Sequence, residues 1–281
     1  MVSVQTAVMK NILLILCPLL FTLSACKKEK EDVDTGKTNT GVRLSEIYWI
    51  SQFDRVDSVD NHWYFYYDSK GYLSSVHVYD SLLTHKSPYH PSYQPRITKR
   101  DYHRNASNTV TRELITGVYE GKTYTSTAEY VYGTGNDLLK VIYSSGTQVQ
   151  DSIEYIWGAG KITGIRMNGG DRHMFTYNSD GNVIDISSFL VVNSGRDTVK
   201  YINKAEISYD SNPNFVRTIQ GLNHPYGLFG LSPECFSKNN MIRYYTDNPP
   251  GYVNYTLEYN SDGYVSRSNP MMRNYVYEKV K

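Results

Sequence analysis

Cys26 is the residue of this chain whose chemistry follows most directly from its neighbours. Lys10 and a short apolar run, Asn11 to Thr22, precede Leu23-Ser24-Ala25 and then the cysteine. The run is too short to cross a bilayer, and the order of charge, apolar run and small residues is that of a secretory signal. The sequence therefore predicts export.

Leu23-Ser24-Ala25-Cys26 resembles the lipobox of bacterial lipoproteins. The resemblance implies that residues 1–25 are a removed signal peptide and that lipidation of Cys26 anchors the chain to a membrane. Buried acyl chains contribute roughly 0.8 kcal/mol per CH2, and two or more chains hold a protein stably. Residues 26–42 are charged and polar, which predicts a flexible tether. The alternative is an ordinary cleaved signal followed by an unmodified cysteine.

Other residues that could do chemistry form no recognisable site. Cys235 is the one further cysteine of the predicted mature chain, so we expect no intramolecular disulfide, and a buried thiol is favoured over a nucleophile. His85 and His90 could share a metal, but the sequence indicates no third ligand. No phosphate loop, zinc helix or serine elbow is found. We therefore expect no cofactor, no metal and no enzymatic activity.

Aromatic residues are the stronger candidates for binding. The chain has 27 tyrosines against 8 phenylalanines and 3 tryptophans, and tyrosine suits half-buried pleated surfaces where the hydroxyl stays in water. Exposed rings are platforms on which sugars pack their C–H faces. Trp63 and Tyr64 near the first hairpin, with Tyr89 and Tyr93 in a proline-rich segment, are the candidate glycan-binding residues. The alternative is that such rings fill the concave side of the sheet.

The charge balance argues against one class of partner. The formal net charge is +1, and removal of Lys10 with the signal brings it to zero. A neutral surface disfavours binding to nucleic acid and a polybasic patch on a membrane. The expected partners are therefore the membrane, through the N-terminal lipid, and a glycan or protein ligand.

A repeated turn predicts the elements that position these residues. Tyr67-Asp68-Ser69-Lys70-Gly71 returns almost unchanged in residues 177–181 and 259–263, and a degraded copy with proline in place of glycine starts at Tyr209. Asp or Asn at the first turn position can bond the backbone ahead of it. The glycine three positions later accepts the left-handed conformation that closes the turn. Each copy therefore predicts a β-hairpin.

The segments between the turns alternate apolar and polar residues with period two, which is typical of strands with one buried face. In Val199 to Tyr209, the parity of Val199 and Ile207 predicts the buried face and that of Lys204 the opposite face. No window after the signal has a helical period with caps. We predict a single all-β domain over residues 43–281, an antiparallel up-and-down meander of hairpins in a curved or partly closed, barrel-like sheet.

Two segments with several prolines, Asp80 to Arg100 and Gln220 to Gly251, interrupt this pattern. Proline cannot donate to a central ladder, and insertions this long are often functional or cover something. The second segment is rich in leucine and aromatic residues, so we predict that it caps or plugs an open sheet.

The turn copies and the region from Leu222 to Asn240 together resemble a family of Bacteroidota lipoproteins of unknown function with a porin-like fold, and more distantly the YD-repeat proteins. The resemblance covers nearly the whole mature domain. It implies a curved antiparallel meander and no catalytic residues.

The function that follows is that of a lipid-anchored lipoprotein of the cell envelope, held on the outer membrane on its periplasmic face or at the cell surface. We predict a non-enzymatic binding module for glycan or protein. Two other functions stay open at this point. A polysaccharide hydrolase needs two carboxylates in one cleft, and a purely structural lipoprotein needs no site at all.

Overall fold

The computed structural model describes residues 41–53, 56–80, 96–119, 121–192, 197–222, 225–247, 249–270 and 272–280. These residues belong to one compact unit, Asp34–Lys281. The predicted signal and Cys26 lie outside the described residues, as do Tyr89, Tyr93 and the pair His85 and His90.

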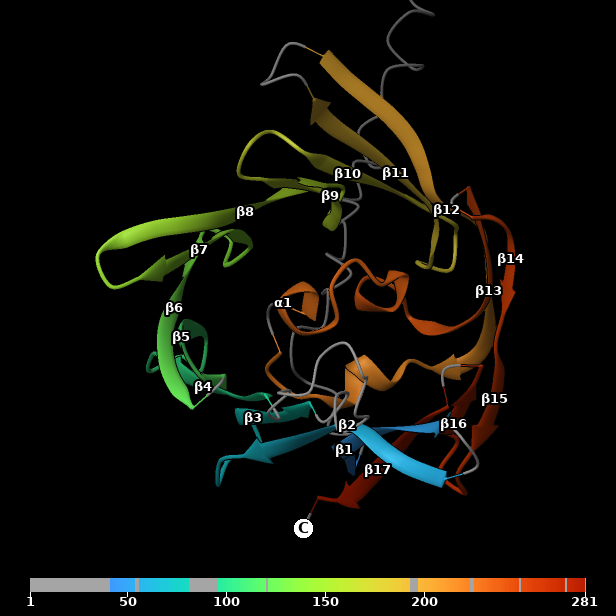
Figure 1. The fold of residues 1–281 in the computed structure, drawn as a ribbon. Coiled ribbons are helices and arrows are strands. Elements are labelled where there is room, and N and C mark those ends of the chain that lie inside the picture. The colour runs from blue at the N-terminus through green and yellow to red at the C-terminus, as the bar shows by residue number, and fades with distance from the viewer. Residues whose placement is uncertain are drawn as a thin grey trace, which may run out of the picture. The chain divides into compact units, whose positions relative to one another are not determined.

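Within the described residues, seventeen strands form one sheet (Figure 1). They are β1 (Val42–Phe53), β2 (Val56–Tyr67), β3 (Leu73–Asp80), β4 (Arg96–Arg104), β5 (Val110–Tyr119), β6 (Lys122–Tyr132), β7 (Leu138–Ser145), β8 (Gln148–Gly158), β9 (Lys161–Met167), β10 (Arg172–Tyr177), β11 (Val183–Val192), β12 (Asp197–Pro213), β13 (Asn239–Asp247), β14 (Pro250–Asn254), β15 (Thr256–Tyr259), β16 (Val265–Asn269) and β17 (Arg273–Lys279).

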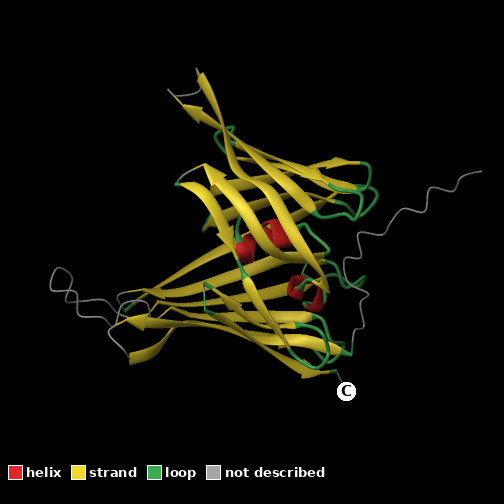
Figure 2. Cartoon of the chain, turned by 90° about the vertical axis from the view of Figure 1, so that its right-hand side faces the viewer, coloured by secondary structure: helices red, strands yellow, loops and turns green. Residues whose placement is uncertain are grey.

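Consecutive strands pair antiparallel from β1 to β14, and β15, β16 and β17 continue the sheet back to β1. Between β14 and β15 the chain has only Tyr255, whose N–H donates to the Ile242 carbonyl of β13 at 2.7 Å. The predicted all-β meander is confirmed: it is a nearly closed, barrel-shaped sheet with one unsealed seam (Figure 2).

The repeated turn has the local chemistry that its sequence predicts. The Oδ1 atom of Asp68 accepts the N–H groups of Lys70 at 2.9 Å and Tyr72 at 3.0 Å, and Gly71 has a φ of +85°. A β-branched residue is strained at such a φ, so glycine is needed there. The turns at residues 178–182 and 260–264 repeat this pattern. A further copy begins at Asn105, where Asn108 takes the left-handed position with a φ of 60°.

The degraded copy at Tyr209 does not form a hairpin, and this part of the prediction is wrong. Asp210 still accepts the N–H of Asn212 at 3.0 Å, but β12 runs on to Pro213 instead of turning back. Asn214 then caps a short 3-10 helix, because its Oδ1 accepts the N–H of Val216 at 2.9 Å. With proline in place of glycine, the chain leaves the sheet at this point instead of reversing.

Aromatic residues late in six strands bond to the strand before them. Each donates a side-chain hydrogen bond of 2.6–2.9 Å to a main-chain carbonyl near the start of that preceding strand. The pairs are Tyr67 with Leu44, Tyr132 with Val110, Trp157 with Leu138, Tyr177 with Ile162, Tyr209 with Val183, and Tyr277 with Val265. Burial raises the pKa of Tyr177 and Tyr277, so these hydroxyls stay protonated donors. These tyrosine hydroxyls bond to the backbone, whereas the composition suggested hydroxyls in water.

The described part of residues 214–238, here called the plug, lies within the curve of the sheet (Figure 1). Residues 223–224 are outside the described ranges. The plug contains the 3-10 helices η2 (Phe215–Thr218) and η3 (Pro233–Cys235) and the short helix α1 (Pro225–Phe229). It is shorter than the predicted insertion from Gln220 to Gly251, because β13 and β14 occupy the second half of that range. Pro250 is tolerated there because it is the first residue of its strand. The first insertion is also shorter than predicted, since β4 starts at Arg96.

The plug joins the two clusters of buried side chains that line the sheet. Tyr226, Leu231 and Phe236 pack on a cluster around Val141, Ile165 and Ile186. Leu228 and Phe229 pack on a second cluster around Leu44, Ile47 and Val76. The plug therefore fills the space between two walls of one sheet, as its apolar composition predicts.

Candidate functional site

Two surfaces of the molecule gather aromatic and polar side chains, one on the outer face of β1, β2 and β3 and the other on the inner face of the sheet. Along β2, Phe65 is buried against the second cluster and Trp63 packs on it, whereas Tyr66 between Phe65 and Tyr67 is 45% exposed. Because successive side chains of a strand alternate between faces, Trp63 faces inward and Tyr64 outward. The two predicted glycan-binding residues that the structure describes are therefore separated by the sheet.

The outer surface carries a group of rings on β1, β2 and β3 that we call the outer strip: Tyr48, His62, Tyr64, Tyr66, His77 and Tyr79. Strand register builds it. Tyr48 lies opposite His62, which lies opposite Tyr79. Glu46 lies opposite Tyr64, which lies opposite His77. Rings on three neighbouring strands thus form one surface.

A chain of hydrogen bonds orders the centre of the outer strip. The His62 Nε2 atom lies 2.8 Å from the Glu46 carboxylate and the Tyr64 hydroxyl lies 3.0 Å from His62 Nδ1. A carboxylate only accepts, so Nε2 carries a proton, and in the tautomer with that single proton Nδ1 accepts from Tyr64. The His62 and Tyr64 rings stack with centroids 4.0 Å apart, and Tyr79 meets Tyr64 edge-on at 5.7 Å. Burial and Glu46 raise the pKa of Tyr64, so its hydroxyl stays protonated.

Trp63 belongs to the interior. Its ring stacks on Phe229 of the plug at 5.5 Å and tilts against Trp49 at 5.5 Å. Its Nε1 atom has no hydrogen-bond partner among the described residues. The indole therefore packs between sheet and plug, as in the alternative in which rings fill the concave side.

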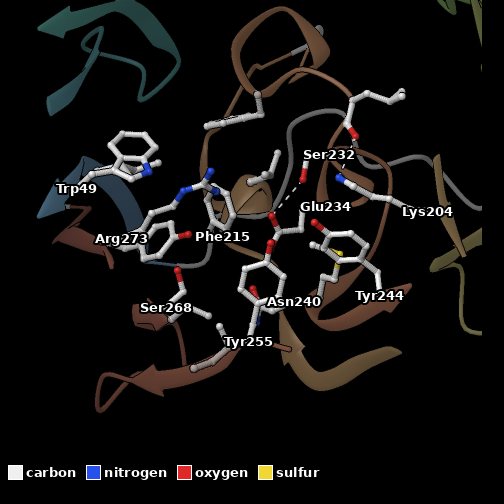
Figure 3. A pocket seen from close by; sticks show the side chains of 18 residues that line it. Trp49, Lys204, Phe215, Ser232, Glu234, Asn240, Tyr244, Tyr255, Ser268 and Arg273 are labelled. Carbon is white, nitrogen blue, oxygen red and sulfur yellow. Dashed lines mark hydrogen bonds between the residues drawn. The ribbon is translucent and has the colours of Figure 1, made fainter. Parts of the chain in front are cut away.

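A cavity of about 260 Å³, here called the plug pocket, lies between the plug and the inner face of the sheet (Figure 3). One wall is a row of directly opposed residues on β1, β17, β16 and β15, namely Trp49, Arg273, Ser268 and Leu257. Lys204 of β12, Tyr244 of β13 and Tyr255 at the seam form the second wall. The plug supplies Phe229, Leu231, Ser232 and Glu234.

Three charged groups meet in the plug pocket. Glu234 accepts a hydrogen bond from the Ser232 hydroxyl at 3.2 Å, and burial raises its pKa above the ordinary value. The Lys204 Nζ atom lies 5.0 Å from the centroid of the Tyr244 ring, and burial lowers its pKa. The Arg273 guanidinium lies 5.1 Å from the centroid of the Trp49 ring. Figure 3 shows Glu234 between the two cations.

Lys204 reaches this interior position through an irregularity that the sequence pattern hides. Glu206 has a φ of +49°, and the pairing of β12 with β13 shifts register between Ala205 and Ser208. Such a bulge reverses the faces of the residues before it relative to those after it. Ile207 is buried as predicted, but Val199 is 50% exposed and Lys204 lies in the pocket. The predicted parity is therefore wrong at Lys204. A second register shift, in the pairing of β12 with β11 between Lys204 and Ile202, restores the predicted face, and Tyr201 lies opposite the buried Ser188.

Two residues that line the pocket each carry a fully buried polar atom for which the described residues supply no partner. Asn240 is 1% exposed, and its Nδ2 atom lies near Asp210 Oδ2 and the carbonyls of Asn212 and Pro213. All three of these are acceptors, so the amide nitrogen must face them and Oδ1 takes the other side. Asn240 Oδ1 and Arg273 Nε are buried without a hydrogen-bond partner among the described residues.

Within the described residues, the plug pocket lacks the groups that catalytic and metal chemistry commonly use, whereas a second, more open hollow is lined by two carboxylates, Asp180 and Asp210. Burial raises the pKa of the Cys235 thiol, which disfavours the nucleophilic thiolate. No three His, Cys, Asp or Glu residues of the described ranges cluster as metal ligands do. Glu234 is the one carboxylate among the described residues that line the pocket, and glycoside hydrolysis generally uses two. Within these ranges no helix is both long and apolar enough to span a membrane.

Comparison with known proteins gives structural neighbours only. No family model and no curated protein matches this sequence. A porin-like protein from Bacteroides uniformis aligns over 84% of this chain and 98% of its own, with 14% identity and a TM-score of 0.37. The Tc holotoxin pore of Photorhabdus luminescens aligns over 84% of this chain and 16% of its own, with 10% identity and a TM-score of 0.27. A porin-like protein and a toxin related to the YD-repeat proteins both fit the resemblance drawn from the sequence, but at such TM-scores neither likeness carries an argument about family or function.

Sequence reasoning did not find the residues of the plug pocket. Arg273 and Trp49 are far apart in the chain and meet only through strand register. Lys204 is placed by the bulge at Glu206. Glu234 follows Ser232 and Pro233 at the start of a 3-10 helix, a local signal that indicates a turn and no ligand. The outer strip had a signal, since alternate residues of one strand, His62, Tyr64 and Tyr66, are all rings.

Proposed function

We propose that this protein is a lipid-anchored lipoprotein of the bacterial cell envelope that binds glycan through the outer strip. The observation that carries the proposal is the set of six rings held in register on one face of β1, β2 and β3. A soluble surface seldom gathers rings in this way without a partner. The lipobox resemblance at Cys26 supports the envelope location.

The outer strip combines the two kinds of contact that a sugar needs. Tyr66 and Tyr79 are 45% and 40% exposed, so their faces are available to C–H groups. Hydrogen-bonding groups stand beside them: the Glu46 carboxylate, and the Lys99 to Asp101 ion pair of 2.9 Å on β4. His77 lies directly opposite Lys99, which joins this ion pair to the rings. Apolar faces and polar edges therefore alternate across about 15 Å of sheet, given roughly 4.8 Å between strands.

A glycan array tests the binding. The domain from Asp34 to Lys281 is applied as wild type and as Tyr64→Ala and Tyr66→Ala, with Tyr252→Ala as the matched control. Tyr252 is also 45% exposed but lies on β14, away from the strip. We expect wild type and the control to bind the same glycans. The two strip variants should lose about tenfold or more in affinity, because each lacks one ring on which a sugar can pack.

Two outcomes contradict the proposal. Equal binding by strip variants and wild type places the ligand elsewhere, and silence across the array favours a protein ligand or a structural role. Incubation of each hit with the domain adds a check on activity. The appearance of shorter sugars would show a polysaccharide hydrolase.

The anchor is tested separately. Replacing Cys26 with Ser removes the only thiol that the lipobox resemblance assigns to acylation. We expect the variant to leave the membrane fraction when cells are fractionated, because the polar tether has no affinity for lipid. A variant that stays in the membrane fraction would show that the anchor is not Cys26.

A further inference from the structure

The plug pocket has the dimensions of a small-molecule site. Its volume of about 260 Å³ lies just below the ~300–1,000 Å³ of ordinary ligand pockets, and equals that of about nine waters at ~30 Å³ each. Trp49, Tyr244 and Tyr255 offer ring surface on its walls. The pocket therefore has room for one ring-sized molecule and not for a polysaccharide chain.

The charged groups of the pocket attract one another, but they are too far apart to form ion pairs. Arg273 and Lys204 both lower the pKa of Glu234, against the larger effect of burial. In the described part of the chain, however, neither cation lies within the 4.0 Å of an ion pair with this carboxylate. Buried charges are costly unless they are paired. With two cations and one carboxylate, the partner that is missing is an anion.

The side chains that line the pocket specify the rest of the ligand. Arg273 donates hydrogen bonds and requires an acceptor, while the Glu234 carboxylate accepts them and requires a donor. A ligand that satisfies both carries an anionic oxygen for Arg273 and hydroxyl groups for Glu234.

We infer that the plug pocket is a second binding site and that it takes a monomeric sugar acid, a ring that bears hydroxyls and one carboxylate. The carboxylate pairs with the planar guanidinium of Arg273, whose geometry suits carboxylates. Lys204 adds a second positive charge, and the hydroxyls donate to Glu234. The C–H face of the sugar packs on the rings of the wall. This site is separate from the outer strip and does not rest on glycan binding there.

Titration calorimetry at pH 7 tests the inference with D-glucuronate, D-galacturonate and D-glucose. Glucose is the neutral counterpart of glucuronate, with CH2OH in place of the carboxylate. We expect at least one of the acids to bind about tenfold or more tightly than glucose. Arg273→Gln keeps a polar side chain but removes the charge, and should weaken binding of that acid by about tenfold or more.

Three further variants make the result decisive. Lys204→Gln removes the charge on the other wall, and should weaken acid binding even if Arg273→Gln fails to fold. Arg166→Gln on β9 is the matched control, because its guanidinium lies outside the pocket and is half exposed; it should bind like wild type. Tyr64→Ala should also bind the acid normally, which separates this site from the outer strip. Failure of both acids to bind, glucose binding as tightly as the acids, or wild-type affinity in both pocket variants would overturn the inference.

Discussion

Two carboxylates in the interior of this sheet have opposite surroundings. Glu113 on β5 is fully buried, and its Oε1 atom lies 2.9 Å from the Arg100 guanidinium while the Tyr130 hydroxyl donates to Oε2 at 3.2 Å. Glu234 in the plug keeps some accessible surface, because the pocket reaches it. No cation of the described residues pairs with it directly.

The difference shows how the same residue type serves structure in one place and leaves chemistry available in another. At Glu113 strands β4 and β6 each bond one carboxylate oxygen, and the side chain is fully buried, so a ligand does not reach it. At Glu234 the cations stand across a cavity, so a third molecule can complete the pairing. A direct pair stabilises local geometry, whereas a separated set of charges favours binding.

The largest expected effect on stability is at the direct ion pair of Arg100 and Glu113. Arg100→Met leaves the Glu113 carboxylate buried without its cation, and breaking such a pair typically costs about 3–5 kcal/mol. Chemical denaturation should show this loss in the free energy of unfolding. The exposed pair of Lys140 and Glu154, at 3.1 Å, gives the control: Lys140→Met should cost about 1 kcal/mol or less. Equal losses in the two variants would mean that burial does not make the pair of Arg100 and Glu113 more costly to break than a surface pair. The contrast with Glu234 would then fail.

A second prediction concerns the residue that holds the plug. Asn214 is fully buried; its Oδ1 accepts the Val216 N–H, and its Nδ2 donates to the main-chain carbonyl of Glu234 at 2.7 Å. Asn214→Ala removes a helix cap and leaves that carbonyl unpaired, so we expect a loss of about 2–4 kcal/mol in stability. Sugar-acid binding should weaken as well, as calorimetry would show.

Asn105→Ala is the control for the plug variant. Asn105 also accepts two backbone N–H groups, but in an exposed turn whose contact with the plug is through the neighbouring Arg104, which donates to the Gly221 carbonyl. We expect a stability loss of about 1 kcal/mol and unchanged ligand affinity. An Asn214→Ala protein that binds as well as this control would show that Asn214 does not position Glu234.

The hydrogen bonds from tyrosine hydroxyls to the preceding strand allow the stability of the two regions to be compared without removing a charge. Tyr177 packs on the first cluster, and Tyr277 packs on the second cluster, where its hydroxyl donates to the carbonyl of Val265, a residue that lines the pocket. Each Tyr→Phe change removes one hydrogen bond and should cost about 1 kcal/mol. Because no charge is involved, the losses should be equal in thermal or chemical unfolding. A loss at Tyr277 that is larger by about 2 kcal/mol would show that the pocket region is weaker in general, apart from its charges.

The smallest expected effect is at Glu234, where the substitution should raise stability instead of lowering it. Burial raises the pKa of Glu234 in the folded chain, so the folded state holds this proton to higher pH than the unfolded state does. Its contribution to stability is therefore full below the unfolded pKa of about 4.3 and is lost as pH rises through the folded value. Glu234→Gln cannot ionise. Without ligand, it should gain stability relative to wild type between pH 4 and pH 7.

Thermal unfolding of both proteins across this pH range provides the measurement. If wild type gains stability over Glu234→Gln as the pH rises, the effect of Arg273 and Lys204 on the pKa of Glu234 outweighs that of burial. Glu234 would then behave as the carboxylate of a direct ion pair does. The contrast with Glu113 would then disappear.

Much of the fold follows from local chemistry and could be predicted. The Asp68 to Gly71 turn and its copies depend on hydrogen bonds within five residues and on a positive φ at glycine, so they are readable from short motifs. Alternation of apolar residues then predicts strands, and strands joined by tight turns predict an antiparallel meander. The outer position of Tyr64 also follows from this alternation once the buried face of β2 is known.

Tertiary structure alone decided the site. The bulge at Glu206 turned Lys204 inward, although its period-two parity indicates the opposite face, because one left-handed residue shifts the pleat without changing the composition of the strand. Closure of the sheet brought Arg273 beside Trp49, and the plug brought Glu234 between Arg273 and Lys204. Such contacts depend on register between strands that are distant in sequence, which no short motif encodes. The sequence by itself determined where the chain turns, and only the packing of sheet around plug determined which side chains meet.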